Sequence, residues 1–198
     1  SPHAIVSFIN RFLEELALLG ETRPVQHVAA QPPPARSAAR RPRAPPPQHV
    51  KFNVDAGIRR GIRGSAAAVC RDNEGNYLGS SAIVISGVDG PATMEMIACR
   101  EALCLVEGLQ VNQFVVASDC KQVIQDISQG TLCSYAAITS EVRARALSFS
   151  CKFIFEGRVV NTEAHSLARF SLRRGPGRHL WLGQPHDPRC IPLSVAYE

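Results

Sequence analysis

Three strand patterns in direct succession, followed by helices that alternate with further strands, restrict this chain to a mixed α/β fold. Residues 50–54 alternate apolar and polar side chains, residues 65–70 form a small apolar run, and residues 77–86 form another strand pattern. The intervening Asp-Asn-Glu-Gly-Asn at 72–76 is a turn signal, so the second and third strands form a hairpin. These residues predict the antiparallel part of a sheet.

The following residues alternate between helix and strand. Helices are predicted over residues 91–108, 121–128, 135–147 and 162–172, with short strands over 114–117 and 151–155. A hairpin-extended sheet whose later strands are joined through helices carries those helices on its faces. Residues 49–172 are therefore predicted to be one α/β domain. Its sheet is mixed and five-stranded, with three antiparallel strands, two strands joined through helices, and helices on both faces.

The segments on either side of this domain have a different composition. Residues 1–30 are an N-terminal extension with an amphipathic helix over residues 4–19. Residues 31–48 are a linker rich in proline and arginine, and its arginines either form a solvated tether, contact phosphates or serve as a localisation signal. Residues 173–198 are a C-terminal tail in which Trp181, the only tryptophan, is expected to pack across the domain surface.

The net charge of +5 lies in these flanking segments. Residues 1–48 hold six basic and three acidic side chains, and residues 49–170 hold twelve of each. The basic composition is therefore a poor argument that the folded domain binds nucleic acid.

Targeting signals and cysteine spacing restrict the compartment. The chain has no apolar run of about 18 residues, which excludes a membrane span, and its start lacks the basic region of a secretory signal. It begins without methionine, which indicates a fragment or a processed product. Seven cysteines without a Cys-x-x-Cys pair argue against a zinc site and favour a reducing compartment. The expected location is intracellular, nuclear or cytoplasmic, and not secreted.

Three carboxylates fall beside segments that should be buried. Asp55 ends the first predicted strand, Glu95 lies near the start of the first long helix, and Asp119 lies where the fourth strand meets the second helix. Singly, the aspartates could be turn formers or helix caps, and Glu95 could be favoured by the helix dipole. Three acids at one sheet edge would repel each other unless cations neutralise them, and oxygen ligands suit Mg²⁺. Together they predict a metal site.

The motifs that carry these acids resemble the ribonuclease H-like domain of plant reverse-transcriptase-like proteins. They are Lys-Phe-Asn-Val-Asp at 51–55, Ala-Ala-Val-Cys-Arg-Asp-Asn-Glu-Gly-Asn-Tyr-Leu at 67–78, Met-Glu at 94–95 with Ala-Leu at 102–103, Ser-Asp-Cys at 118–120, and Asn-Thr-Glu-Ala-His-Ser-Leu-Ala at 161–168. The resemblance implies a ribonuclease H-like fold that cleaves the RNA strand of RNA–DNA hybrids with two Mg²⁺ ions. Asp55 would bridge both ions and Glu95 and Asp119 would bind one each, and Mn²⁺ could substitute.

The chain departs from the family pattern at two places. His165 stands where ribonuclease H enzymes usually carry a fourth acid. Histidine is a poor Mg²⁺ ligand but acceptable to Mn²⁺, and it is interpreted as a proton shuttle near neutral pH or as a hydrogen-bonded residue without chemistry.

The second departure is the loop after Asp55, where arginines replace a glycine-rich substrate-contacting loop. Arg59, Arg60 and Arg63 are expected to contact phosphates. Asn161, in the last motif, is carried over from the resemblance as a further nucleic-acid contact.

These features favour a metal-dependent ribonuclease H-type nuclease, derived from a retrotransposon, that acts on RNA–DNA hybrid or other nucleic acid. No small-molecule cofactor and no membrane partner are expected, and a monomer is assumed. Two alternatives remain open. One is a non-catalytic nucleic-acid-binding module that keeps the fold, for which His165 argues. The other is a remnant reading frame without a selected function.

Overall fold

The computed structural model describes residues 41–59, 61–88, 90–130 and 133–198. The predicted helix over residues 4–19 lies outside this part, as does most of the linker. The elements follow in the order β1 (Val50–Arg59), β2 (Arg63–Arg71), β3 (Tyr77–Ser86), α2 (Pro91–Leu109), β4 (Gln113–Ser118), α3 (Lys121–Gln129), α4 (Ala136–Ala146), β5 (Ser150–Phe155), the 3-10 helix η1 (Arg158–Val160), α5 (Thr162–Ser171) and β6 (Gly177–Leu182). No helix in these residues has the length and apolar character needed to cross a bilayer.

The sheet has the mixed topology that the sequence predicts. Its strand order is β5-β4-β1-β2-β3-β6. β1, β2 and β3 pair antiparallel in succession, and β4 and β5 lie parallel to β1 on the other side. The prediction of an α/β fold with three antiparallel strands and two joined through helices is confirmed.

The number of strands is a correction, because the sheet has six strands and not five. The sixth, β6, comes from the segment expected to be a tail and pairs antiparallel with β3. Glycines and a proline around residues 175–177 indicate the end of a domain, but the free edge of β3 offers backbone groups that any segment can pair with. Trp181 lies in this strand and packs edge-on against Phe170 of α5.

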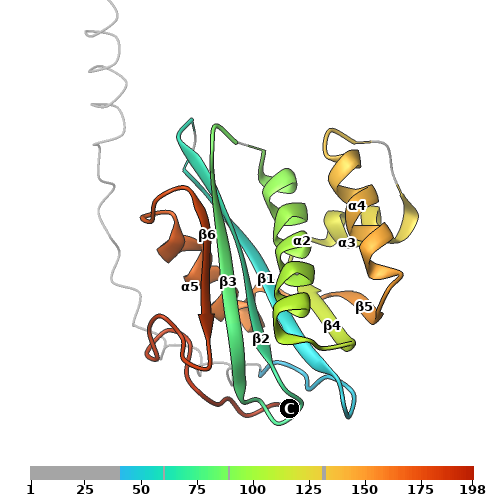
Figure 1. Cartoon of the computed structure of the whole chain (residues 1–198), viewed down its shortest axis with the longest axis vertical. Coiled ribbons are helices and arrows are strands. Elements are labelled where there is room, and N and C mark those ends of the chain that lie inside the picture. Colours follow the sequence, from blue (N-terminus) through green and yellow to red (C-terminus); the bar gives the residue numbers. More distant parts are fainter. Residues whose placement is uncertain (1–40, 60, 89, 131–132) are drawn as a thin grey trace, which may run out of the picture. The chain divides into compact units, whose positions relative to one another are not determined.

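Helices cover both faces of the sheet, as predicted (Figure 1). α2, α3 and α4 lie on one face and α5 lies on the other. Alternate residues of β2 therefore enter different cores. Ala66 and Ala68 pack with α2, whereas Ala67 and Val69 pack with Leu167 of α5. Small side chains along β2 let both helices approach the sheet closely.

The first strand is also longer than predicted. It continues to Arg59, since β2 pairs with it along its whole length as a hairpin. Asp55 therefore does not end this strand but lies within it, opposite Ala67. The glycines and arginines after Asp55 are more typical of a loop, and strand pairing of the backbone overrides that local preference.

Candidate functional site

Three carboxylates from separate elements converge where β1 loses its parallel neighbour. β4 pairs with β1 as far as Ser118 opposite Val54, so Asp119 and Asp55 each follow the last paired residue. Oxygens of Asp55, Glu95 and Asp119 all lie within 4.8 Å of one another. Three carboxylates at this separation form a donor set suited to a hard divalent cation.

Glu95 reaches this point because α2 packs closely on β2. Met94, the residue before it, is fully buried. Gly64 on β2 provides the room, since a Cβ atom there would lie 2.7 Å from Met94 Sδ. The close approach brings the start of α2 over the sheet and Glu95 to the two aspartates.

The cluster is crowded with negative charge in a largely buried position. Asp55 is only 4% exposed. Burial, then the charges of Asp55 and Asp119, raise the pKa of Glu95 to about 8. Burial also raises the pKa of Asp55, and its hydrogen bond with His165 opposes that rise. Glu95 Oε2 is buried without a hydrogen-bond partner. A carboxylate oxygen in this state is suited to a cation.

The raised pKa of Glu95 predicts a pH-dependent stability. Between its ordinary value of 4.5 and about 8, the folded protein holds more protons at Glu95 than the unfolded chain does. The free energy of unfolding of the metal-free protein should therefore fall as pH rises through this window. Thermal unfolding in EDTA, measured at several pH values across this range, gives the fall in stability. Added Mg²⁺ should make the fall in stability smaller.

The Glu95→Gln variant should have a smaller fall than the wild type over the same window. Glu74→Gln is the matched control, because Glu74 is exposed in the turn between β2 and β3. An equal fall in wild type and Glu95→Gln would show that Glu95 titrates normally.

His165 projects from α5 onto the cluster. Its Nδ1 lies 2.7 Å from Asp55 Oδ2, and its side chain is 29% exposed. Since a carboxylate accepts in this contact, the proton is assigned to Nδ1. One oxygen of Asp55 is thus engaged by a donor from α5.

Asn161 joins the start of α5 to β1. Its Nδ2 donates to the carbonyl of Val54 at 2.8 Å, and its Oδ1 accepts from Asn53 Nδ2 at 3.3 Å. Asn161 is 1% exposed. Its amide group therefore holds the backbone immediately before Asp55 and is engaged within the protein.

Two of the arginines expected to contact nucleic acid, Arg59 and Arg63, lie at the tip of the β1–β2 hairpin. Arg59 and Arg63 pair across it, and Arg59 is exposed. Arg63 Nη1 donates to the carbonyl of Arg174 at 2.8 Å, so part of its guanidinium is already engaged. Arg60 lies outside the described residues.

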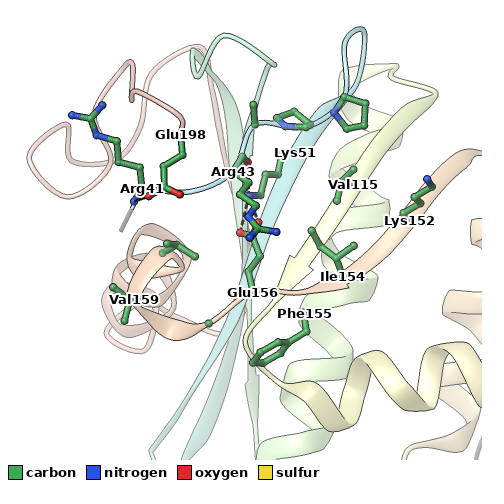
Figure 2. Close-up of a pocket in the computed structure, with 15 residues that line it drawn as sticks. Arg41, Arg43, Lys51, Val115, Lys152, Ile154, Phe155, Glu156, Val159 and Glu198 are labelled. Carbon is green, nitrogen blue, oxygen red and sulfur yellow. Dashed lines mark hydrogen bonds and ion pairs between the residues drawn. The ribbon is translucent and has the colours of Figure 1, made fainter. Parts of the chain in front are cut away.

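A buried ion pair joins β1 to the end of β5, and neither of its residues was predicted as a site residue. Lys51 Nζ lies 2.7 Å from both carboxylate oxygens of Glu156. Figure 2 shows the two side chains pointing toward one another. The side chains are 1% and 10% exposed. Burial lowers the pKa of Lys51, and the hydrogen bond that Lys51 donates to Glu156 opposes this lowering. The sequence signal that could have indicated this ion pair is a lysine inside a strand whose other residues are mostly buried.

Solved ribonuclease H structures are similar to this chain. The ribonuclease H1 of the halophilic archaeon Halobacterium salinarum has a TM-score of 0.59 at 15% identity, over 64% of this chain and 99% of that chain. The N-terminal ribonuclease H domain of a Mycobacterium tuberculosis protein, fused to maltose binding protein, has a TM-score of 0.57 at 21% identity, over 63% and 93%. LC11-RNase H1, isolated from compost, in complex with an RNA/DNA hybrid has a TM-score of 0.54 at 16% identity, over 60% and 92%. At these identities the likeness shows the fold.

Comparison at the level of sequence gives one clear family. The family model described as reverse transcriptase-like matches residues 53–171. This span includes Asp55, Glu95, Asp119 and His165. A comparison with curated proteins gave no match.

Proposed function

Because the chain belongs to the reverse transcriptase-like family, we propose that it is a divalent-metal-dependent nuclease that cleaves the RNA strand of RNA–DNA hybrids. The observation that carries the proposal is the convergence of Asp55, Glu95 and Asp119 within 4.8 Å. The ribonuclease H fold supports it, and one neighbour with this fold is complexed with an RNA/DNA hybrid.

Asp55, Glu95 and Asp119 would hold two Mg²⁺ ions, for which Mn²⁺ could substitute. The residues fit such ions, since Glu95 Oε2 is buried without a hydrogen bond and the pKa values of Asp55 and Glu95 are raised. When bound, two ions of this kind activate a water and stabilise the leaving 3′ oxygen of an in-line displacement.

Other side chains of the domain would orient the cluster and the substrate. The Nδ1–H group of His165 holds Asp55 Oδ2, and Asn161 holds the carbonyl of the preceding residue. Arg59 and Arg63 would contact phosphates from the hairpin tip, which positions the nucleic acid without reading its sequence. Arg60 is a further candidate for such a contact. Preference for RNA at the cleaved strand would come from contacts to 2′-hydroxyl groups in the minor groove.

A cleavage assay with the purified full chain tests this proposal. The substrate is a hybrid labelled on the RNA strand, in Mg²⁺, in Mn²⁺ and in EDTA, with single-stranded RNA, RNA duplex and DNA duplex of the same sequence as comparisons. We expect internal cleavage of the hybrid RNA in either ion and none in EDTA. No hybrid cleavage in either ion, or equal cleavage of all substrates, would contradict the proposal.

A second candidate function is a non-catalytic nucleic-acid-binding module. The observation that favours it is the 2.7 Å contact between His165 and Asp55, because it occupies an oxygen that would otherwise be free for a metal. The two candidates differ in whether the carboxylate cluster, with His165 beside Asp55, binds Mg²⁺ in a way that supports cleavage.

The His165→Asp variant separates the two candidates. It places an oxygen ligand beside Asp55, so the Mg²⁺ concentration for half-maximal cleavage should fall about 10-fold or more, which is the scale on which partners of metal ligands act. The effect in Mn²⁺ should be smaller, because Mn²⁺ accepts imidazole more readily. Cleavage rates measured over a range of Mg²⁺ concentrations and over a range of Mn²⁺ concentrations give the two effects.

His165→Asn is the matched control for that variant, since it removes the imidazole without adding a charge. A wild type that is inactive, with activity gained only in His165→Asp, identifies a binding module. A wild type that cleaves hybrid in Mg²⁺ identifies an enzyme that tolerates histidine. If His165→Asp and His165→Asn respond alike, the added carboxylate does not bind the metal.

A further inference from the structure

Two stretches of the chain carry arginines and no acidic residue, and both adjoin the carboxylate cluster. Between Asp55 and Asp72 the sequence has four arginines and no acid, and between Glu163 and Asp187 it again has four arginines and no acid. The first stretch forms the end of β1 and all of β2, and the second forms most of α5 and all of β6. The first begins directly after Asp55, and the second contains His165, which contacts Asp55 at 2.7 Å.

One flank of α5 lies against β1. His165 marks this flank by its contact with Asp55, and Leu172 marks it again two turns later, since a Cβ atom at Gly57 would lie 3.1 Å from Leu172 Cδ1. Arg169 is four residues after His165 and three before Leu172, so its side chain leaves the same flank of the helix. Arg169 is exposed. It therefore lies beside β1, between the carboxylate cluster and the hairpin tip.

The end of α5 meets the tip of the β1–β2 hairpin. Arg63 Nη1 donates to the carbonyl of Arg174 at 2.8 Å, and Arg59 pairs with Arg63 across the hairpin. Arg173 directly precedes Arg174, follows Arg169 by four residues, and is exposed. Arginines from the hairpin and from the end of α5 are therefore gathered at one place.

The charges of this surface are available to a ligand. Among the residues that the structure describes, no acidic side chain forms an ion pair with Arg59, Arg169 or Arg173. β4 pairs with β1 only as far as Val54, so it does not cover the side of β1 along residues 56–59. An anion can approach this part of β1 from the side on which β4 has ended.

The arginines extend over a similar distance on both elements. Arg59 is four residues beyond Asp55, which is roughly 13 Å along a strand. Arg173 is eight residues beyond His165, which is roughly 12 Å along a helix. A nucleic-acid duplex advances about 3.4 Å for each base pair, so either distance corresponds to about three to four base pairs. The repeated charge over this length is suited to a duplex backbone.

We propose that Arg169 and Arg173, together with Arg59 and Arg63, form a basic track that binds the phosphates of a duplex on one side of the carboxylate cluster. Contacts of this kind position the nucleic acid without reading its sequence. The inference rests on the proposed function for the place of the cleaved phosphate. It adds that cleavage requires about three to four base pairs of duplex on that side.

Binding of a labelled hybrid to the full chain tests the track, with Ca²⁺ in place of Mg²⁺ to prevent cleavage. Fluorescence anisotropy is measured over a range of KCl concentrations. Arg169→Gln and Arg173→Gln should each weaken binding about 10-fold at low salt and lower the salt dependence by about 0.9 in log units, for one lost phosphate contact. Arg169→Lys should keep most of the affinity, because lysine retains the charge. A DNA duplex should show the same losses, since it carries the same phosphates.

Arg189→Gln is the matched control, because it removes an exposed arginine far from the track. Arg189 follows β6, whose last residue pairs near the start of β3, at the end of the sheet opposite the hairpin tip. This variant should bind like the wild type. An unchanged salt dependence in Arg169→Gln and Arg173→Gln, or an equal loss in Arg189→Gln, would show that the track does not bind phosphates.

The required length of duplex is tested with substrates in which a short block of ribonucleotides fixes the cleaved position. The duplex is shortened on one side of the block at a time. Wild-type cleavage should fall when one of the two sides is shorter than about three to four base pairs. The double variant Arg169→Gln with Arg173→Gln should cleave the long substrate and the one shortened on that side at the same reduced rate. A wild-type dependence on length in the double variant would overturn the inference.

The outcomes for the track and for the proposed function are separable. If the wild type cleaves hybrid but Arg169→Gln and Arg173→Gln bind it as the wild type does, the inference is wrong and the nuclease proposal stands. If hybrid is never cleaved but these two variants lose binding and Arg189→Gln does not, the track is assigned and the nuclease proposal fails. If polyglutamate binds in an Arg169-dependent way and neither duplex does, the track binds an acidic protein segment and the inference is wrong.

Discussion

The Asp119→Asn variant is expected to lose hybrid cleavage by about 1,000-fold or more, because a metal ligand supplies several kcal/mol of transition-state stabilisation. The substitution removes a charge and keeps the shape of the side chain. Asp119 lies between β4 and α3 and forms part of the cluster with Asp55 and Glu95. Initial cleavage rates with hybrid in saturating Mg²⁺ measure the loss, and circular dichroism checks the fold.

Removing this charge should also relieve repulsion within the cluster. The charge of Asp119 is one cause of the raised pKa of Glu95, so the metal-free variant should unfold at a higher temperature than the metal-free wild type at neutral pH. Glu74→Gln is the matched control, since it removes an acid from the exposed turn between β2 and β3. Cleavage by Asp119→Asn at the wild-type rate would show that the proposed site is wrong.

The position of the three acids could be predicted from the sequence because each one lies beside a strong local pattern. Asp119 follows a short β-rich run that becomes β4, and Glu95 lies in a long helix most of whose residues are buried. Parallel pairing of β1 with β4 then brings Asp55 and Asp119 to the same end of that pairing. Local periodicity and one topological rule are sufficient to predict this convergence.

Features that depend on the pairing of one strand with another were not predictable in the same way. The residues after Asp55 contain glycines and arginines that are typical of a loop, yet they continue β1 because β2 pairs with them. The segment Gly177–Leu182 becomes β6 because the edge of β3 is available to it. Backbone hydrogen bonds stabilise both strands, and these bonds carry little sequence signal.

The buried ion pair of Lys51 and Glu156 is equally non-local. Lys51 and Glu156 are 105 residues apart, and Lys51 also donates to the carbonyl of Arg43 at 2.9 Å. No spacing within the sequence connects these residues. Only the parallel placement of β1, β4 and β5 brings the two charges together.

The Lys51→Met variant is expected to lower the free energy of unfolding by about 3–5 kcal/mol, the usual loss when one partner of a buried ion pair is removed. Methionine fills much of the space of the lysine stem but leaves the carboxylate of Glu156, whose side chain is only 10% exposed, without its cation. The cost arises from an uncompensated buried charge more than from a lost attraction. Urea denaturation measures the difference.

The double variant Lys51→Met with Glu156→Gln separates these two contributions. It removes both charges, so it should be more stable than Lys51→Met alone, because no unpaired carboxylate remains in the low-dielectric site. If Lys51→Met lowers stability by less than about 1 kcal/mol, the pair behaves as an exposed salt bridge and Glu156 is hydrated. If the double variant is the less stable of the two, attraction between the charges outweighs their desolvation, and the pair is a net stabilising contact between β1 and the end of β5.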